Sequence, residues 1–169
     1  MSIDDQEKYI REYLSMTRSH FATYHNHKEQ LSYLATGLYL TVTLALFFQK
    51  SLDETHRISS PFLAFVAIAV FTLITYLFVW RQLLLRSVSD KIIAACDKQR
   101  LEWIRAFPPD TKLCPKVYKP YAWLSIDMPE FLYEKIPAKE SKSVIHLRRL
   151  TLGAILFDCC VVIFRLFVL

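Results

Sequence analysis

The pattern of hydrophobic and polar residues divides the chain into three long apolar stretches joined by polar segments. Residues 31–49 hold 19 positions without a charged side chain, and residues 61–80 hold another 20. At a rise of about 1.5 Å per residue, each stretch is long enough for a helix to cross a hydrocarbon core of about 30 Å. Since residues 50–60 are polar, the two stretches predict a hairpin of transmembrane helices at 31–49 and 61–80, joined by an external turn.

A third apolar stretch follows at residues 150–169, where only Asp158 and Arg165 are charged. We expect a helix over residues 141–169 that forms a third membrane crossing. The chain is 53% hydrophobic, and these residues are massed in three places instead of being dispersed with a helical or strand period, as in a water-soluble domain. The predicted fold class is therefore an all-α integral membrane protein with three transmembrane helices.

Apolar residues continue at helical spacing beyond both ends of the predicted hairpin. In residues 1–30 they recur every three or four positions and enter the first span without a proline, and a similar stripe follows the second span over residues 81–106. Pro108 and Pro109 then end the helix. The first two transmembrane helices are thus expected to extend into an antiparallel helical pair outside the membrane.

Six of the seven prolines fall in residues 107–140, together with many aromatic side chains. This proline spacing disfavours long helices and central strands, whereas the aromatic residues disfavour disorder. We expect a compact wrap with one short helix near residues 129–134.

Lys and Arg are distributed unequally about the predicted spans. Residues 81–149 contain 14 of them, whereas residues 50–60 contain two. By the positive-inside rule, the N-terminus and the long segment between the second and third spans are cytoplasmic, and the turn and the C-terminus are external. No positively charged segment with a small-residue cleavage site precedes residue 31, so the first span is expected to be retained.

The first span has two faces suited to helix packing. Gly37, Thr41 and Ala45 form a stripe of small residues, and hydroxyl groups form a second stripe on roughly the opposite side. One neighbour of this helix is the second span, and the other is either the third span or another subunit. The hydroxyl stripe consists of Ser32, Thr36, Tyr39 and Thr43, of which Thr36, Tyr39 and Thr43 are candidate pore residues.

Asp158 and Arg165 lie two turns apart on one face of the third span. Ionisable residues inside a membrane rarely face lipid, so this face is expected to point toward a bundle interior or toward water. Two interpretations remain open: an ion pair with a neighbouring helix, or the polar lining of a pore or gate.

The N-terminal helix carries a basic and aromatic cluster that includes Arg18, His20, His25 and Lys28. Repeated around an oligomer, such groups would hold an anionic nucleotide or oligonucleotide through phosphate contacts and stacking. The alternative is a solvated face attracted to anionic lipid. Arg18 and His25 also match the loose spacing of HEPN-type ribonucleases, but the helical domain of those enzymes is missing.

Catalytic and cofactor motifs are not found in the sequence. His20 and His27 share a helical face without an acidic third ligand, so no metal site is expected. With two glycines the chain has no phosphate-binding loop, and its four cysteines show neither metal-type spacing nor a disulfide framework. The expected protein is not an enzyme and uses no cofactor.

The arrangement of residues 5–106 resembles that of small membrane effectors in bacterial anti-phage systems. These include the two-span effectors encoded beside cyclic-nucleotide synthases and the Hailong-type channel, which is held by the short DNA product of a nucleotidyltransferase. The resemblance is architectural, carries no diagnostic motif, and does not extend to the third span. It implies a multi-pass protein of the bacterial inner membrane with a cytosolic nucleotidyltransferase or other sensor as partner.

The function expected from these features is an oligomeric ion channel that depolarises the inner membrane. An anionic nucleotide or oligonucleotide at the cytoplasmic helices would control its opening. The alternative is a non-catalytic membrane anchor or assembly subunit that docks a cytosolic partner.

Overall fold

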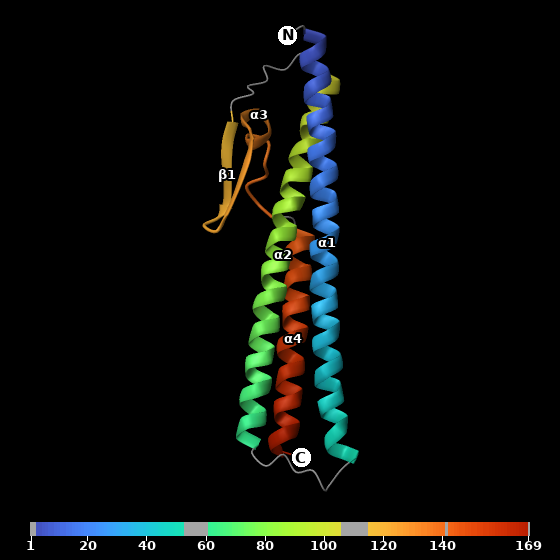
Figure 1. The fold of residues 1–169 in the computed structure, drawn as a ribbon, viewed down its shortest axis with the longest axis vertical. Coiled ribbons are helices and arrows are strands. Elements are labelled where there is room, and N and C mark those ends of the chain that lie inside the picture. Colours follow the sequence, from blue (N-terminus) through green and yellow to red (C-terminus); the bar gives the residue numbers. More distant parts are fainter. Residues whose placement is uncertain (1–2, 53–60, 106–114, 141, 169) are drawn as a thin grey trace. The chain divides into compact units, whose positions relative to one another are not determined.

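The computed structural model describes residues 3–52, 61–105, 115–140 and 142–168. Within the helices, the side chains at 3, 4, 6, 46–52, 61–64, 103–105, 143 and 165–168 lie outside this description. The elements, in chain order, are α1 (Ile3–Leu52), α2 (Pro61–Arg105), β1 (Pro115–Tyr121), β2 (Leu124–Pro129), α3 (Glu130–Tyr133) and α4 (Lys142–Val168) (Figure 1).

The chain is mostly helical, as the periodicity of the sequence predicts. The expected continuous helix over residues 5–49 is confirmed by α1, and the extension of the second helix to about residue 106 is confirmed by α2. Neither helix contains an internal proline, because Pro61 stands at the first position of α2, where its missing N–H costs no helical hydrogen bond. Of the predicted turn at 50–60, residues 50–52 belong to α1 instead, and residues 53–60 lie outside the described residues, as do the helix stop at Pro108 and Pro109 and the predicted helix start at Ser141.

Contacts divide the chain into two compact units. Met1–His27 and Leu85–Ser141 make up the first, which we call the hairpin unit. Lys28–Leu84 and Lys142–Leu169 make up the second, which we call the three-helix unit. Each long helix α1 and α2 therefore contributes one part to each unit.

The prediction of an all-α chain is wrong over residues 115–129, which form an antiparallel β-hairpin of β1 and β2. Val117 pairs with Asp127 and Tyr118 with Ile126, and the register becomes irregular between Tyr118 and Tyr121. Valine, isoleucine and aromatic residues favour strands, and a two-stranded ladder has only edge strands, which tolerate proline. The expected short helix near 129–134 is confirmed by α3.

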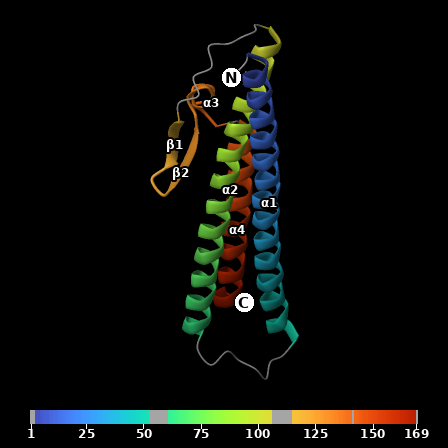
Figure 2. The ribbon, with the colours of Figure 1, turned by 45° about the horizontal axis from the view of Figure 1, so that its top comes forward.

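The core of the hairpin unit joins α1, α2 and α3. Ile10 and Leu14 of α1 pack in one buried cluster with Ile92 of α2 and with Phe131 and Leu132 of α3. The β-hairpin packs on this cluster through partly buried aromatic and aliphatic side chains. Figure 2 shows β1 and β2 side by side next to α3. Aromatic residues between the prolines therefore fix the segment after α2 to the helical pair.

The three-helix unit contains the part of α1 from Lys28, the part of α2 up to Leu84 and the whole of α4, and these three helices run side by side in both views (Figures 1 and 2). Its buried apolar cluster consists of Tyr39, Val79, Leu83, Leu152 and Ile155. Among the described residues, one helical stretch, Phe65–Glu102, is long and apolar enough to cross a membrane by length and composition. Three crossings stay a prediction.

Candidate functional site

Tyr39 lies where α1, α2 and α4 meet inside the three-helix unit. Its hydroxyl lies 3.0 Å from Oγ1 of Thr72 on α2 and donates to the carbonyl oxygen of Ile155 on α4 at the longer distance of 3.5 Å. Its ring stacks on Phe71, with 5.5 Å between centroids, and the side chain is fully buried. The predicted pore residue Tyr39 is therefore the polar contact common to all three helices.

Hydroxyl groups above and below Tyr39 also face the interior of this unit. Ser32 and Thr43 of α1 are fully buried, and Thr72 and Thr75 of α2 are less than a tenth exposed. Each donates its hydroxyl hydrogen to a carbonyl three or four residues earlier in its own helix, as half-buried Thr36 does. The hydroxyl stripe predicted from the sequence thus faces inward.

Asp158 lies on the inward face of α4, one turn from the buried residues Ile155 and Val162. Its Oδ2 atom is buried and has no hydrogen-bond partner in the described part of the chain. The carboxylate interacts electrostatically with the Tyr39 phenol. Arg165 belongs to α4, but its side chain lies outside the described residues, so the choice between an ion pair with a neighbouring helix and a pore lining stays open.

The small-residue face of α1 is uncovered. Gly37, Thr41 and Ala45 are exposed, and a Cβ atom added at Gly37 would meet no other atom within 4 Å. The sequence leaves open whether the third span or another subunit is the second neighbour of this helix, without assigning either to a face. In this structure α4 contacts the Tyr39 side of α1, where Tyr39 bonds to Ile155.

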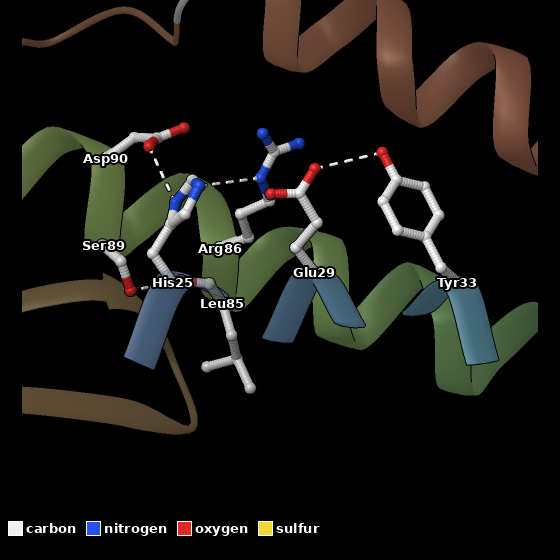
Figure 3. Close-up of polar contacts among 7 residues, drawn as sticks. All are labelled: His25, Glu29, Tyr33, Leu85, Arg86, Ser89 and Asp90. Carbon is white, nitrogen blue, oxygen red and sulfur yellow. Dashed lines mark hydrogen bonds and ion pairs between the residues drawn. The ribbon is translucent and has the colours of Figure 1, made fainter. Parts of the chain in front are cut away.

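His25 of α1 lies between two side chains of α2 in the hairpin unit (Figure 3). Its Nδ1 lies 2.9 Å from Oδ1 of Asp90, and its Nε2 accepts a hydrogen bond from Nε of Arg86 at 3.3 Å. This arrangement fits the imidazole tautomer that carries its hydrogen on Nδ1. The His25 side chain is only 15% exposed, so it is part of the contact between α1 and α2.

Arg18 makes a second polar contact between the same two helices. Its Nε donates to Oδ1 of Asp97 at 2.7 Å, and this hydrogen bond raises the pKa of Arg18. Arg18 and His25 are seven residues apart on α1, and Asp97 and Asp90 are seven apart on α2. Two heptad-spaced pairs therefore fix the antiparallel register of the helices.

The other two residues of the predicted anion site are His20 and Lys28. His20 is exposed and packs edge-on against Phe21, with 5.3 Å between ring centroids. Lys28 belongs to the three-helix unit, whereas Arg18, His20 and His25 belong to the hairpin unit. In the part of the chain that the structure describes, no group of three or more His, Cys, Asp and Glu side chains is arranged to hold a metal ion.

Sequence reasoning missed the carboxylates that face the cluster, Asp90 and Asp97. Their seven-residue spacing matches that of His25 and Arg18 in reverse chain direction, and this match was a usable signal. It also missed Gln82, which is 8% exposed and whose Oε1 has no hydrogen-bond partner among the described residues.

The β-hairpin carries an exposed aromatic tip. Tyr121 and Trp123 stack with 5.5 Å between ring centroids, and Trp123 and Val117 are each 49% exposed. Lys116 forms an ion pair with Glu130 that raises the pKa of its ammonium group. Desolvation by burial raises the pKa of Tyr118, which lies edge-on to Tyr133.

Comparisons with known proteins add no relative: no protein-family model matches this chain, and no significant similarity links it to a curated protein or to a solved structure.

Proposed function

We propose that the chain is an oligomeric ion-conducting membrane protein whose three-helix unit is the membrane-embedded part. The observation that carries this proposal is the distribution of side chains in that unit. Its interior holds hydroxyl groups and a carboxylate beside the buried apolar cluster, and many large apolar side chains point outward, as expected where the solvent is lipid. The exposed apolar residues include Leu34, Leu38, Leu44, Leu73, Ile74, Leu150, Phe157 and Phe164, which come from α1, α2 and α4.

In this proposal, α1, α2 and α4 each cross the inner membrane of a bacterium. The length and apolar composition of α2 support the second crossing. The first and third crossings are supported by the outward apolar side chains of α1 and α4 and by the hydrogen bonds that join both helices to α2 through Tyr39 and Thr72.

Assembly into a symmetric homo-oligomer is supported by the uncovered face at Gly37. Small residues spaced four apart let two helices approach closely in lipid, where close van der Waals packing drives association. Because α4 occupies the other side of α1, a second copy of the chain is the partner proposed for this face.

Control by an anionic nucleotide or oligonucleotide is proposed to act through Arg18. Its guanidinium is about half exposed and already bonded to Asp97, so a phosphate group would compete with that carboxylate. Ligand binding would thereby break one polar contact between α1 and α2. A cytosolic nucleotidyltransferase or similar sensor would supply the ligand, in keeping with the architectural resemblance to anti-phage effectors.

A second candidate function is a non-conducting anchor that docks a cytosolic partner. The exposed Trp123 ring, which stacks on Tyr121, and the edge strands of the two-stranded β-hairpin favour it. The two functions make opposite predictions about ion flow.

The test expresses the chain in bacteria and follows the membrane potential with a voltage-sensitive dye, beside native mass spectrometry of the purified protein in mild detergent. Wild type should depolarise the cells and run as an oligomer, and Gly37→Leu should lower both depolarisation and the oligomer-to-monomer ratio at least tenfold. Gly153→Leu is the matched control, because it places the same side chain at the other glycine, also open to its surroundings. A monomeric wild-type protein that leaves the potential unchanged would refute the proposal.

A further inference from the structure

The interior of the three-helix unit presents oxygen atoms whose hydrogens are already donated elsewhere. Ser32 Oγ donates to Glu29 O at 2.8 Å, Thr43 Oγ1 to Tyr39 O at 3.0 Å, and Thr75 Oγ1 to Phe71 O at 2.9 Å. A hydroxyl group has one hydrogen, so each of these oxygens is left with lone pairs only. Toward the interior they act as hydrogen-bond acceptors or as ligands of a cation.

The oxygen atoms continue across the contact between the helices. Thr72 Oγ1 lies within hydrogen-bond distance of Ile68 O at 2.8 Å, of the Tyr39 hydroxyl at 3.0 Å and of Cys159 Sγ at 3.4 Å. None of the buried side chains that the structure describes in this unit belongs to Lys or Arg. The oxygen-rich interior thus has no basic group of its own among those residues.

Asp158 adds a negative charge to this interior. Its Oδ2 is buried, without a hydrogen-bond partner in the described ranges, and the carboxylate interacts with the Tyr39 phenol. A buried carboxylate is stable only where an opposite charge or hydrogen-bond donors compensate for lost water. The hydroxyl hydrogens of this interior are directed elsewhere: those of Thr43 and Thr75 point to carbonyl groups of their own helices, and that of Tyr39 points to Ile155 O.

We infer that the interior around Asp158, Tyr39 and Thr72 binds a monovalent cation and makes the conducting state selective for cations; this rests on the proposed function. Alkali cations bind carboxylate, hydroxyl and carbonyl oxygen, and this interior holds all three beside its apolar cluster. One carboxylate per chain balances one positive charge, which favours K⁺ or Na⁺ over a divalent ion. In a symmetric oligomer Asp158 recurs in every subunit, and repeated acidic side chains are a common source of cation selectivity.

The test measures the K⁺-to-Cl⁻ permeability ratio of the purified full-length protein from currents across planar bilayers under a KCl gradient. Wild type should favour K⁺ at least tenfold, and Asp158→Asn should bring the ratio close to one. Asp158→Glu, which keeps the charge, should keep K⁺ selectivity. Asp127→Asn is the matched control, because Asp127 is exposed on β2 and its replacement should leave the ratio unchanged.

The asparagine variant is expected to fold, because it removes a buried charge without removing a hydrogen-bond partner of any described residue. Thr72→Val provides a second variant that deletes one lining oxygen at similar volume, and it should lower the ratio severalfold. A conducting wild type with a ratio near one, or a ratio unchanged in both variants, would overturn the inference alone. A wild-type oligomer that carries no current would overturn the proposed function and this inference with it.

Discussion

Nδ1 of His25 and Oδ1 of Asp90 lie 2.9 Å apart, and this pair joins α1 to α2 in the hairpin unit (Figure 3). His25→Ala should lower the free energy of unfolding by about 1–3 kcal/mol, since it leaves the partly buried Asp90 without this contact. Chemical denaturation of the detergent-solubilised protein, followed by circular dichroism, measures the change. His20→Ala is the matched control on the same helix and should stay within about 0.5 kcal/mol, because His20 is exposed. Equal effects of the two substitutions would contradict the assigned contact.

Cys96 is fully buried in the core of the hairpin unit, and desolvation by burial raises the pKa of its thiol to about 11. Since only the thiolate reacts, a pKa raised from 9.0 to about 11 lowers the reactive fraction at pH 8 by about a hundredfold, and burial slows the reaction further. The rate of thiol labelling at Cys96 should therefore rise with pH until about pH 11. Maleimide labelling of a variant with serine at Cys114, Cys159 and Cys160 tests this.

The control for the labelling experiment is Ala94→Cys in a background that also has serine at Cys96. Ala94 is exposed on α2, two residues from the buried thiol, so its replacement should label quickly. Similar labelling rates for the two cysteines in the folded protein would show that the core around Cys96 is open.

Asp97 competes with any phosphate group for Arg18, given the hydrogen bond of 2.7 Å between their side chains. Asp97→Asn should therefore tighten the binding of a short single-stranded oligonucleotide severalfold at low salt, and Arg18→Gln should weaken it severalfold. Binding should also weaken as salt rises, because phosphate contacts release counterions. Fluorescence anisotropy measures these affinities, and a tighter complex with Arg18→Gln than with wild type would remove Arg18 from the ligand site.

The proposed three membrane crossings would place the N-terminus and the C-terminus on opposite sides of the membrane. Alkaline phosphatase, which is active only outside the inner membrane, should be active when fused after Leu169 and inactive when fused in place of residues 108–114. Green fluorescent protein should show the reverse pattern. An active phosphatase at both sites, or at neither, would be incompatible with the proposed topology.

The long helices could be predicted because their signal is repeated many times along the chain. Ile10 and Leu14 follow the helical period, and both are buried against α2 as that period implies. The inward hydroxyl stripe at Tyr39 and Thr43 was predictable for the same reason, because residues at this spacing share one side of a helix.

The β-hairpin could not be predicted as readily because its local signals conflict. Pro115, Pro120 and Pro129 oppose strand formation, and the strands form through contacts distant in sequence, such as that of Met128 with the cluster around Ile92. The contacts of Arg18 with Asp97 and of His25 with Asp90 could not be predicted from α1 alone, because its sequence pattern does not show which residues of α2 face it. The partner of Arg18 is 79 residues away, and only the pairing of α1 with α2 brings it near.

Ion conduction by the three-helix unit is the central claim, and single-channel recording from the purified wild-type oligomer in a planar bilayer tests it most directly. The account predicts discrete current steps, and it predicts that Gly37→Leu abolishes them while Gly153→Leu keeps them. A bilayer that stays electrically silent after verified insertion of the wild-type oligomer, with and without oligonucleotide, would contradict it.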